Sequence, residues 1–293
     1  MIKALKDLKN LLKKYNFWPL HLLPLFMIYT GVNTVDFIVL GAYYFTGIFF
    51  VVAGYHRYFS HRTFKTSRWF QFVLAFGAMA TAQKGVLWWA SHHRDHHRYS
   101  DTDKDIHSAK LKGFYYSHVG WILAPDYKDT DFNKIKDFAK YPELVWLNKH
   151  YWVPPTVVGA AMFLFGGASM LFCSFFLGVV LLWHGTFTIN SLAHKWGRQR
   201  YETGDESRNS LFLALLTLGE GWHNNHHHYM HSTRQGFFWY EIDIAYYILK
   251  AMSWVGLVWD IRGVPDHAKY AHLADDRLQK NKSADAAITD QAA

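Results

Sequence analysis

The sequence predicts an all-α integral membrane protein, with four transmembrane helices arranged as two hairpins and a helical cytoplasmic cap that holds a histidine-rich site for two metal ions. Three observations support this fold class. Four long runs of the chain lack acidic and basic residues, all the basic residues fall on one side of these runs, and histidines gather in three short boxes.

The four uncharged runs predict the spanning helices. They cover Trp18–Val35, Phe37–Tyr55, Tyr151–Ser169 and Met170–Ala193, and none contains Lys, Arg, Asp or Glu. Each is close to the roughly 20 residues that a helix needs to cross a bilayer. Because the runs follow one another in pairs, each pair predicts a helical hairpin with a very short outer turn, near residues 31–36 and near residues 166–169.

Charge placement predicts the orientation. With four spans, both termini and the long 56–150 segment lie on one side, and all 31 Lys and Arg residues fall there. The positive-inside rule makes that side cytoplasmic. The cap then consists of residues 56–150 and 194–273, and it forms a single domain, residues 1–273, with the spans. Two shorter apolar segments, Trp69–Ala82 and Ile242–Trp259, are expected at the membrane interface or packed within the cap.

The two ends of the chain differ in composition. The N-terminal stretch carries Lys3, Lys6, Lys9, Lys13 and Lys14, and we expect it to be amphipathic and to lie at the membrane interface. Residues 274–293 are polar and rich in alanine, so we expect a disordered tail.

Composition also excludes several kinds of site and partner. The single cysteine, Cys173, excludes a disulfide framework and a cysteine-based zinc or iron–sulfur site. A net charge of +8 is compatible with nucleic-acid binding, but the apolar runs assign it to a cytoplasmic face beside anionic lipid. We therefore expect a lipid bilayer, and no nucleic acid, among the partners.

Three short boxes contain the candidate metal ligands. They read His56-Arg-Tyr-Phe-Ser-His61, His93-Arg-Asp-His96-His97 and His223-Asn-Asn-His226-His227. Eight imidazoles exceed the four ligands that one zinc ion usually takes. Imidazole suits iron as well as zinc and copper. The number therefore favours two metal ions that share a site.

The spacing within the boxes is typical of helices. Residues i, i+3 and i+4 share one helix face, so the histidines of each H-x-x-H-H box project together and can serve both metals. His56 and His61 are five residues apart, about 140° around an α-helix. We expect them either at a frayed helix end or splayed toward two metals.

Five motifs occur in a fixed order and bracket both predicted hairpins. They are H-R-Y-F-S-H, H-R-D-H-H-R-Y-S, G-F-Y-Y-S-H-V-G-W (Gly113–Trp121), N-S-L-A-H (Asn190–His194) and G-E-G-W-H-N-N-H-H (Gly219–His227). In this order the sequence resembles membrane fatty-acid desaturases of the acyl-CoA Δ9 (stearoyl-CoA desaturase) type, over about Thr34–Pro265. The segment Arg234–Asp243 is similar to the bacterial branch, which implies a multi-pass protein of the bacterial inner membrane.

The resemblance implies an activity and a ligand set. The activity is O2-dependent introduction of a cis double bond, at Δ9, into a saturated acyl chain. The family pattern adds His194 as a ninth histidine, and it adds Asn190, a position that faces one metal through water. The implied metal residues are therefore His56, His61, His93, His96, His97, Asn190, His194, His223, His226 and His227.

The implied cofactors are two iron ions, with O2 as co-substrate. Removing hydrogen from an unactivated methylene needs a strong oxidant, which a diiron centre makes from O2 and two electrons. We expect no catalytic residue beyond the metal ligands. Because the chain has no haem-binding or flavin-binding module, the electrons must come from a partner such as ferredoxin, cytochrome b5 or a flavoprotein reductase. A basic cytoplasmic face suits an acidic donor.

An acyl tunnel also follows from the resemblance. Trp89, Thr186 and Phe187 match positions that line the tunnel in the family. Leu40 and Tyr44 lie at positions that close its methyl end in the family, although core packing is the default expectation for both.

One departure from the family concerns the substrate head group. The Arg-Asp pair that contacts CoA in vertebrate members is Ser91-His92 here. Fatty acyl-CoA and the acyl chain of a phospholipid therefore both stay open as substrates.

Further polar residues near the boxes are expected to contact the ligand histidines and not to bind metal themselves. Glu220, Asp95 and Asp101 are candidates to orient ligand imidazoles through their free N–H groups, and solvated or helix-cap roles stay equally open for them. His118 is a candidate for the same outer layer, whereas His92, His228 and His231 break the box pattern and are not expected to bind metal.

Two alternatives to desaturation stay open from the sequence. One is another oxidation on the same scaffold, namely hydroxylation, ketolation or alkane oxidation. The other is a metal transporter or sensor, which would place ionisable ligands at mid-bilayer. The boxes lie at or beyond the predicted helix ends, and this position favours an enzyme.

Overall fold

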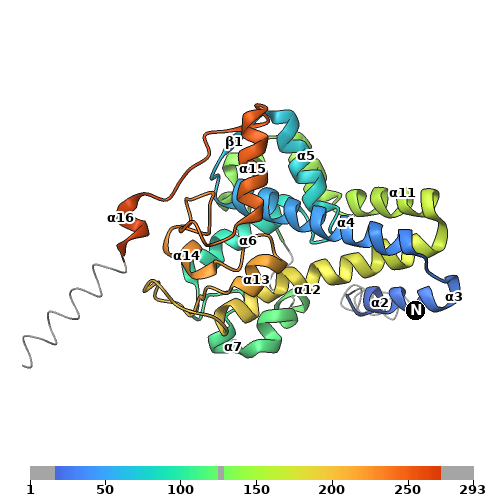
Figure 1. The fold of residues 1–293 in the computed structure, drawn as a ribbon, viewed down its shortest axis with the longest axis horizontal. Coiled ribbons are helices and arrows are strands. Elements are labelled where there is room, and N and C mark those ends of the chain that lie inside the picture. Colours follow the sequence, from blue (N-terminus) through green and yellow to red (C-terminus); the bar gives the residue numbers. More distant parts are fainter. Residues whose placement is uncertain (1–16, 125–128, 272–293) are drawn as a thin grey trace, which may run out of the picture.

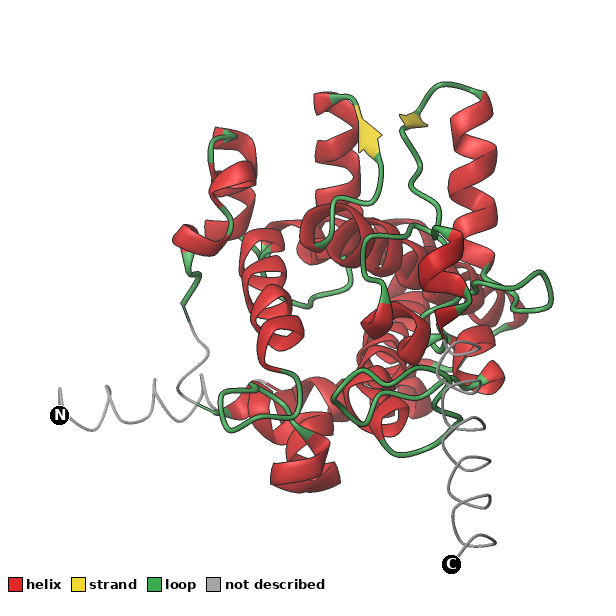
Figure 2. Cartoon of the chain, turned by 90° about the vertical axis from the view of Figure 1, so that its left-hand side faces the viewer, coloured by secondary structure: helices red, strands yellow, loops and turns green. Residues whose placement is uncertain are grey.

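The computed structural model describes residues 17–124 and 129–271, so the N-terminal lysine stretch and the 274–293 tail lie outside the described residues. The described chain is mostly helical, as predicted (Figure 2). One small antiparallel sheet, with two residues in each strand, pairs β1 (Lys65–Thr66) with β2 (Val258–Trp259). This sheet is a minor correction to the all-α prediction, and it joins two parts of the cap that are distant in sequence.

The first apolar run does not form one continuous α-helix. It consists of α2 (Phe17–Leu22), the 3-10 segment η1 (Leu23–Phe26) and α3 (Met27–Thr30). Pro24 lies in the first turn of η1, and proline removes a backbone donor from α-helical hydrogen bonding. The first run is therefore a shorter apolar segment than the sequence predicted.

The first hairpin turns at a capping box. The Asn33 side chain accepts hydrogen bonds from the backbone N–H groups of Val35 (2.8 Å) and Asp36 (3.2 Å), and Asp36 accepts one from the Asn33 N–H (2.9 Å). This arrangement starts α4 (Thr34–Phe50). A π-helix, η2 (Val51–Ser60), continues α4 without a break, so the second helix extends beyond its predicted end at residue 55.

The second hairpin reverses at Gly167, within the predicted turn. Its φ of +69° is in the left-handed region, where glycine is not strained. α11 (Val153–Met170) contains this reversal, and η6 (Leu171–Leu177), α12 (Gly178–Ser191) and η7 (Leu192–His194) form the returning arm. Figure 1 shows α11, α12 and α4 running along one another away from the cap.

A buried carboxylate joins the two hairpins near their outer turns. The Ser174 hydroxyl donates to the Asp36 carbonyl (2.7 Å), and the Ser169 hydroxyl donates to the Asp36 carboxylate (3.4 Å). Asp36 is fully buried. Its capping role therefore also positions the second hairpin against α4.

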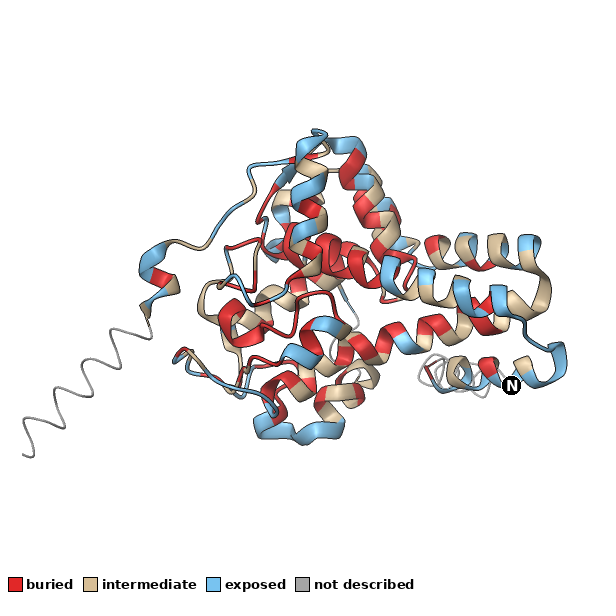
Figure 3. Cartoon of the chain, viewed as in Figure 1, coloured by how far each residue is buried: buried red, intermediate tan, exposed pale blue. Residues whose placement is uncertain are grey.

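Two helices are long and apolar enough to cross a membrane: Thr34–Ser60, with 27 residues, and Val153–His194, with 42. The second includes the reversal at Gly167, and Phe17–Thr30 is a shorter apolar helix. The hairpin helices carry many exposed positions, whereas buried positions concentrate in the cap (Figure 3). The structure thus supports two candidate membrane helices, and the four-span topology stays a prediction.

The rest of the described chain forms the helical cap. Its helices are α5 (Arg68–Met79), α6 (Val86–Tyr99), α7 (Ala109–Tyr115), η3 (Tyr116–Gly120), α8 (Trp121–Leu123), η5 (Phe132–Lys134), α9 (Lys136–Ala139), α10 (Pro142–Lys149), α13 (Leu211–Leu216), α14 (His223–His228), α15 (Ile244–Trp254) and α16 (Asp266–Lys269). The main core packs α5, α6, α10 and α15 against η2, with Leu74, Leu87 and Leu249 fully buried. This core fixes the ends of the long helices against the elements that carry the histidine boxes.

Candidate metal centre

Nine histidines gather into two adjacent groups. The five-histidine group contains His56, His61, His93, His97 and His226. The four-histidine group contains His96, His194, His223 and His227. In each group the ligand atoms lie within 4.8 Å of one another. The structure therefore brings together all nine histidines of the predicted ligand set.

The π-helical end of η2 explains how His56 and His61 meet. A π-helix has hydrogen bonds between residues five apart, and the His61 N–H donates to the His56 carbonyl over 3.2 Å. The two rings then lie 4.9 Å apart, between centroids. Both histidines belong to the five-histidine group, so the expectation that they splay toward two metals is wrong. The alternative, a frayed helix end, is not found either, because this end is a hydrogen-bonded π-helix.

Each H-x-x-H-H box gives two histidines to one group and one histidine to the other. On α6, the i and i+4 residues His93 and His97 join the five-histidine group, while His96 between them joins the other. On α14, the i and i+4 residues His223 and His227 join the four-histidine group, and His226 joins the five. Each helix therefore supplies both groups, as the spacing predicted.

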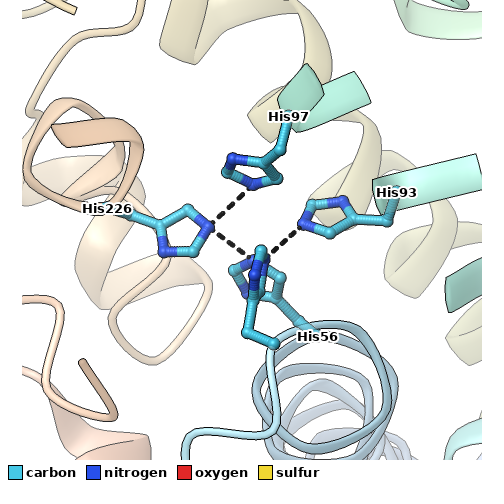
Figure 4. Close-up of side chains that lie close together, drawn as sticks. His56, His93, His97 and His226 are labelled. Atoms are coloured by element: carbon cyan, nitrogen blue, oxygen red, sulfur yellow. Dashed lines mark hydrogen bonds between the residues drawn. The ribbon is translucent and has the colours of Figure 1, made fainter. Parts of the chain in front are cut away.

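Most of the close contacts in the groups join Nε2 atoms. In the five-histidine group the Nε2 of His226 lies 2.9 Å from that of His56 and 2.9 Å from that of His97. Figure 4 shows these rings and that of His93 pointing toward one another. In the four-histidine group, the Nε2 atoms of His194 and His223 lie 3.1 Å apart.

Carboxylates hold the outer nitrogens of several rings. In the four-histidine group, His96 Nδ1 lies 3.0 Å from Asp105, His194 Nδ1 lies 3.3 Å from Asp101, and His227 Nδ1 lies 2.6 Å from Asp205. In the five-histidine group, His56 Nδ1 contacts Glu220. A carboxylate on Nδ1 fixes the tautomer that leaves Nε2 free to bind a metal.

The sequence identified some of these carboxylates and missed others. Glu220 and Asp101 orient ligand imidazoles as expected. Asp95 does not, because it lies two residues after His93 and its carboxylate contacts Lys134 Nζ at 2.5 Å. Asp105 and Asp205 were missed. They follow the second box and the fourth apolar run at spacings that carry no local signal.

A buried cation completes the support of His56. Arg57 is fully buried, and its guanidinium contacts Glu220 (3.2 Å) and Asp243 (3.0 Å). It also donates to the Thr233 carbonyl (2.8 Å). A buried charge is costly unless it is paired and hydrogen-bonded, so this network fixes the carboxylate that holds the His56 ring.

Electrostatics favour neutral imidazoles, the form that binds metal. Burial, together with the neighbouring histidines, holds the pKa of His61, His93, His97, His223 and His226 well below the usual value. Burial lowers the pKa of His227 to about 4, although Asp205 opposes this shift. Burial alone would raise the pKa of Asp205, but the hydrogen bond and charge of His227 lower it below the ordinary range.

This donor set fits metal ions. The Nδ1 of His227 faces a carboxylate and carries the proton, so its Nε2 is an unprotonated lone pair. That Nε2 is buried and has no hydrogen-bond partner among the described residues. Converging lone pairs on neutral, buried imidazoles repel one another unless a cation lies between them, and imidazole suits iron, zinc and copper.

A family model for fatty acid desaturases matches residues 36–259. The chain belongs to the fatty acid desaturase family. It is 35% identical over 212 residues to the sn-2 palmitoyl-lipid 9-desaturase of Nostoc sp. (strain 36), covering 71% of this chain and 74% of that protein. It is also 35% identical over 222 residues to the sn-1 stearoyl-lipid 9-desaturase of Anabaena variabilis, covering 75% of this chain and 81% of that protein. It is 33% identical over 246 residues to the acyl-CoA C20 Delta5-desaturase of Anemone leveillei, covering 83% of this chain and 78% of that protein. The predicted family is confirmed.

A narrow cavity in this desaturase family member borders both histidine groups. It is lined by His56 and His93, by His96 and His223, and by Asn190, Glu220, Trp89, Thr186, Ile189, Thr217, Ile48, Val51 and Val52. Asn190, Trp89 and Thr186 all line this cavity, and their roles at a metal or in an acyl tunnel stay predictions. The Gln83 amide donates to the Thr186 hydroxyl (3.0 Å) and fixes this side of the wall.

The other expected tunnel residues do not line this cavity. Phe187 follows Thr186 and is rotated by about 100° around α12. It is buried in a second apolar cluster with Phe17 and Trp183, so it does not line this cavity, and its place in a tunnel stays a prediction. Tyr44 lies one helical turn before the cavity residue Ile48, and its hydroxyl donates to the Leu216 carbonyl (3.2 Å).

Leu40 and His118 also lie away from the groups, whereas a further histidine, His107, contacts a member of one. Leu40 lies another turn outward, beside Gly178. His118 contacts His184 (2.9 Å) and Ser191 (2.9 Å) rather than a ligand histidine, so its expected outer-layer role is not what the structure shows. His107, to which the sequence assigned no role, packs on His96 with ring centroids 4.2 Å apart.

Proposed function

We propose that this chain is an O2-dependent diiron fatty acyl desaturase that introduces a cis double bond at C9 of a saturated acyl chain, with electrons from an external donor. The observation that carries the proposal is the pair of reciprocal histidine groups bordering one narrow, largely apolar cavity. Two metal sites beside a channel for an apolar chain are what removal of two hydrogens from adjacent methylenes requires.

Iron ions held by these histidines, with Asn190 bordering the centre through water, would supply O2 activation. The overall change is balanced: the two-carbon unit loses two hydrogens, O2 gains four electrons in all, two from the acyl chain and two from the donor, and two protons taken up complete two waters. The chain's own residues hold one C–C bond beside the metals. Trp89 and Thr186 line the cavity together with His93 and His96, and Ile48 and Val52 give its wall apolar side chains.

The substrate proposal favours a lipid-linked acyl chain over acyl-CoA. Ser91 and His92 take the place of the expected CoA-binding pair, and both contact the Trp88 carbonyl (2.9 Å each) instead of projecting as a charged pair. Two of the similar proteins above are named for lipid-linked substrates and one for an acyl-CoA. Acyl-CoA is the second candidate, and the assay below includes it.

The proposed setting is a bacterial inner membrane with four spans and the metal centre on the cytoplasmic side. Phe17–Thr30 and the first arm of α11 are the two short arms, and Thr34–Ser60 and the arm ending at His194 are the two long ones. Both long arms end in the metal centre. Ferredoxin, cytochrome b5 or a flavoprotein reductase supplies the electrons.

Product analysis tests this proposal. Cells or lipid nanodiscs containing the protein receive saturated 16- and 18-carbon chains deuterated at C9 and C10, either as phospholipid or as acyl-CoA. Mass spectrometry should find loss of two deuterium atoms and a cis double bond at C9, first in the lipid-linked pool. A hydroxylated or ketone product would replace desaturation with another oxidation, and unchanged substrate in both pools would contradict the proposal.

A further inference from the structure

One face of α10 presents apolar side chains at the surface of the cap. Its i, i+3, i+4 and i+7 positions, which share one side of an α-helix, are Pro142, Val145, Trp146 and Lys149. The opposite side packs into the main core through Leu144 and Leu147. Trp146 is 51% exposed. The core therefore holds α10 through one face and leaves a second apolar face at the surface.

This face forms one wall of an open pocket of about 480 Å³. The pocket is lined by Pro142, Val145, Trp146 and Lys149, together with Ala139, Lys140 and His150. Its volume is in the usual range for small-molecule sites. The ring of His150 stacks on that of Trp146, with centroids 4.6 Å apart, and His150 Nδ1 donates to the Trp146 carbonyl (2.9 Å). The pocket shares no residue with the cavity that borders the metal centre.

Two lysines of the pocket have no acidic partner within the described residues. Lys140 and Lys149 are both exposed, and Lys140 Nζ lies 5.2 Å from the centre of the Tyr141 ring. Glu143, the acidic residue of α10, is already held by Arg68 through two hydrogen bonds of 2.7 and 2.8 Å. None of the residues that line the pocket is acidic. The pocket therefore places two positive charges without a counter-ion beside an apolar wall, which suits an amphipathic anion.

The pocket lies where the chain enters a candidate membrane helix. Lys149 precedes by four residues the start of Val153–His194, which is long and apolar enough to cross a membrane. Between them lie Tyr151 and Trp152, which are 49% and 57% exposed. Tyrosine and tryptophan are enriched at membrane–water interfaces, and lysines beside a span attract anionic headgroups. The pocket is therefore at the level of the lipid headgroups.

We propose that this pocket binds an anionic phospholipid, whose phosphate contacts Lys140 and Lys149 and whose acyl chains begin along Val145 and Trp146. A soluble phosphate offers the same charge, but it would use neither the apolar wall nor the position beside the span. The inference goes beyond the proposed function, because the site is on a different surface from the metal centre and its occupation needs neither metal nor turnover.

Lipid titration tests the charge of the site. Full-length protein in detergent is titrated with phosphatidylglycerol or phosphatidylcholine, and native mass spectrometry measures the bound lipid. The first phosphatidylglycerol should bind about tenfold more tightly than the first phosphatidylcholine, because each lysine near the surface favours an anionic headgroup. In Lys140→Gln/Lys149→Gln this preference should be lost. Equal affinity of the wild type for both lipids would overturn the proposal.

A second double variant is the matched control. Lys104→Gln/Lys250→Gln removes the same charge from two other exposed lysines, one near an aromatic ring, as Lys140 is, and one on a helix, as Lys149 is. It should keep the preference for phosphatidylglycerol. If both double variants lose the preference equally, net charge and not this pocket explains the binding. All four substituted lysines are exposed, and unchanged melting temperatures without added lipid check that both variants are folded.

Two further arms identify the occupant and its place. Inorganic phosphate at a tenfold excess over phosphatidylglycerol should not displace the lipid, and displacement would make this a site for soluble anions. Phosphatidylglycerol with brominated acyl chains should quench tryptophan emission less in Trp146→Leu than in the wild type. Trp239→Leu, which removes an 84% exposed tryptophan from another surface, should be quenched like the wild type. Equal quenching of Trp146→Leu and the wild type would contradict binding along α10.

Discussion

The two histidine groups differ in how many imidazoles they contain and in how many of these contact a carboxylate. The five-histidine group has more imidazoles but only one carboxylate contact within the described residues, from Glu220 to His56. The four-histidine group has fewer imidazoles, and three of its members contact carboxylates. A carboxylate makes an imidazole a stronger ligand. The comparison suggests that ligand number in one group is balanced by ligand strength in the other.

The comparison also separates the helices that carry the groups from the loops that support them. α6 and α14 contribute histidines to both groups, whereas Asp101, Asp105 and Asp205 lie in loops beside the four-histidine group. Changes in the two helices should therefore affect both groups, and changes in the loops should affect only one.

The largest expected effect comes from removing a ligand. His→Ala at any of the nine positions should abolish unsaturated product, because each group loses part of its coordination. The middle histidines His96 and His226 should behave like the others even though each lies on the helix that mainly serves the other group. Labelled-substrate mass spectrometry measures the product, and blue-native gels check membrane insertion.

The neighbouring histidines provide the control for this prediction. His228 stacks on Tyr201, with centroids 4.0 Å apart, and belongs to neither group. His228→Ala and His231→Ala should retain substantial activity. If either is as inactive as His227→Ala, the ligand set is wrong.

A smaller effect should distinguish the groups. Asp205→Asn should weaken metal binding at the four-histidine group about 10- to 100-fold, because such outer carboxylates typically contribute that much. The five-histidine group should keep its metal, so a chelator titration should remove one metal well before the other. Asp95→Asn is the matched control, since Asp95 contacts Lys134. Simultaneous loss of both metals would show that the groups are not independent.

Acidification should lower the folding stability of the metal-free protein through histidines of both groups. The pKa of His227 is lowered to about 4, and burial holds those of His61, His93 and His226 well below the usual 6.5. The folded metal-free protein therefore holds these rings neutral, while the unfolded chain takes up protons below about pH 6.5. Stability should be complete above this pH and should fall steadily toward pH 4. Thermal unfolding of metal-free protein measures this, and a midpoint independent of pH over that range would contradict it.

The smallest effect is expected from a substitution that leaves both histidine groups intact. Tyr44→Ala opens space one turn beyond the cavity residue Ile48, so longer acyl chains should gain preference. A methylene is worth about 1–3 kcal/mol of discrimination, which predicts a shift and not a switch. Competition between 16- and 18-carbon substrates measures the ratio. Loss of a buried aromatic can cost about 3–5 kcal/mol of stability, so an unchanged ratio counts against the idea only in well-folded protein.

The sequence predicted the groups well where helix periodicity decides the outcome. The i, i+3, i+4 spacing in α6 and α14 indicated that each box supplies both histidine groups, and the motif order indicated the family. It failed where geometry is not α-helical or not local. The π-helix under His56 and His61 has no local signature. Asp95 lies inside a box, yet a position two residues from His93 lies on the opposite side of the helix.

The same limit explains the tunnel and the first span. Thr186 and Phe187 are adjacent in sequence but face a cavity and an apolar cluster respectively. Only packing between α12 and its neighbours determines which of them reaches the cavity. Pro24 is visible in the sequence, but an uncharged run alone did not indicate that the helix around it would be broken into shorter pieces.

The most direct test of the central claim is a metal count. Protein purified from iron-replete cells is analysed by inductively coupled plasma mass spectrometry against an amino-acid quantification of the chain. The two histidine groups predict two metal ions per chain, with iron in both, and zinc replacing iron in an overloaded preparation would still give two. One metal ion per chain at saturation would contradict a two-metal centre.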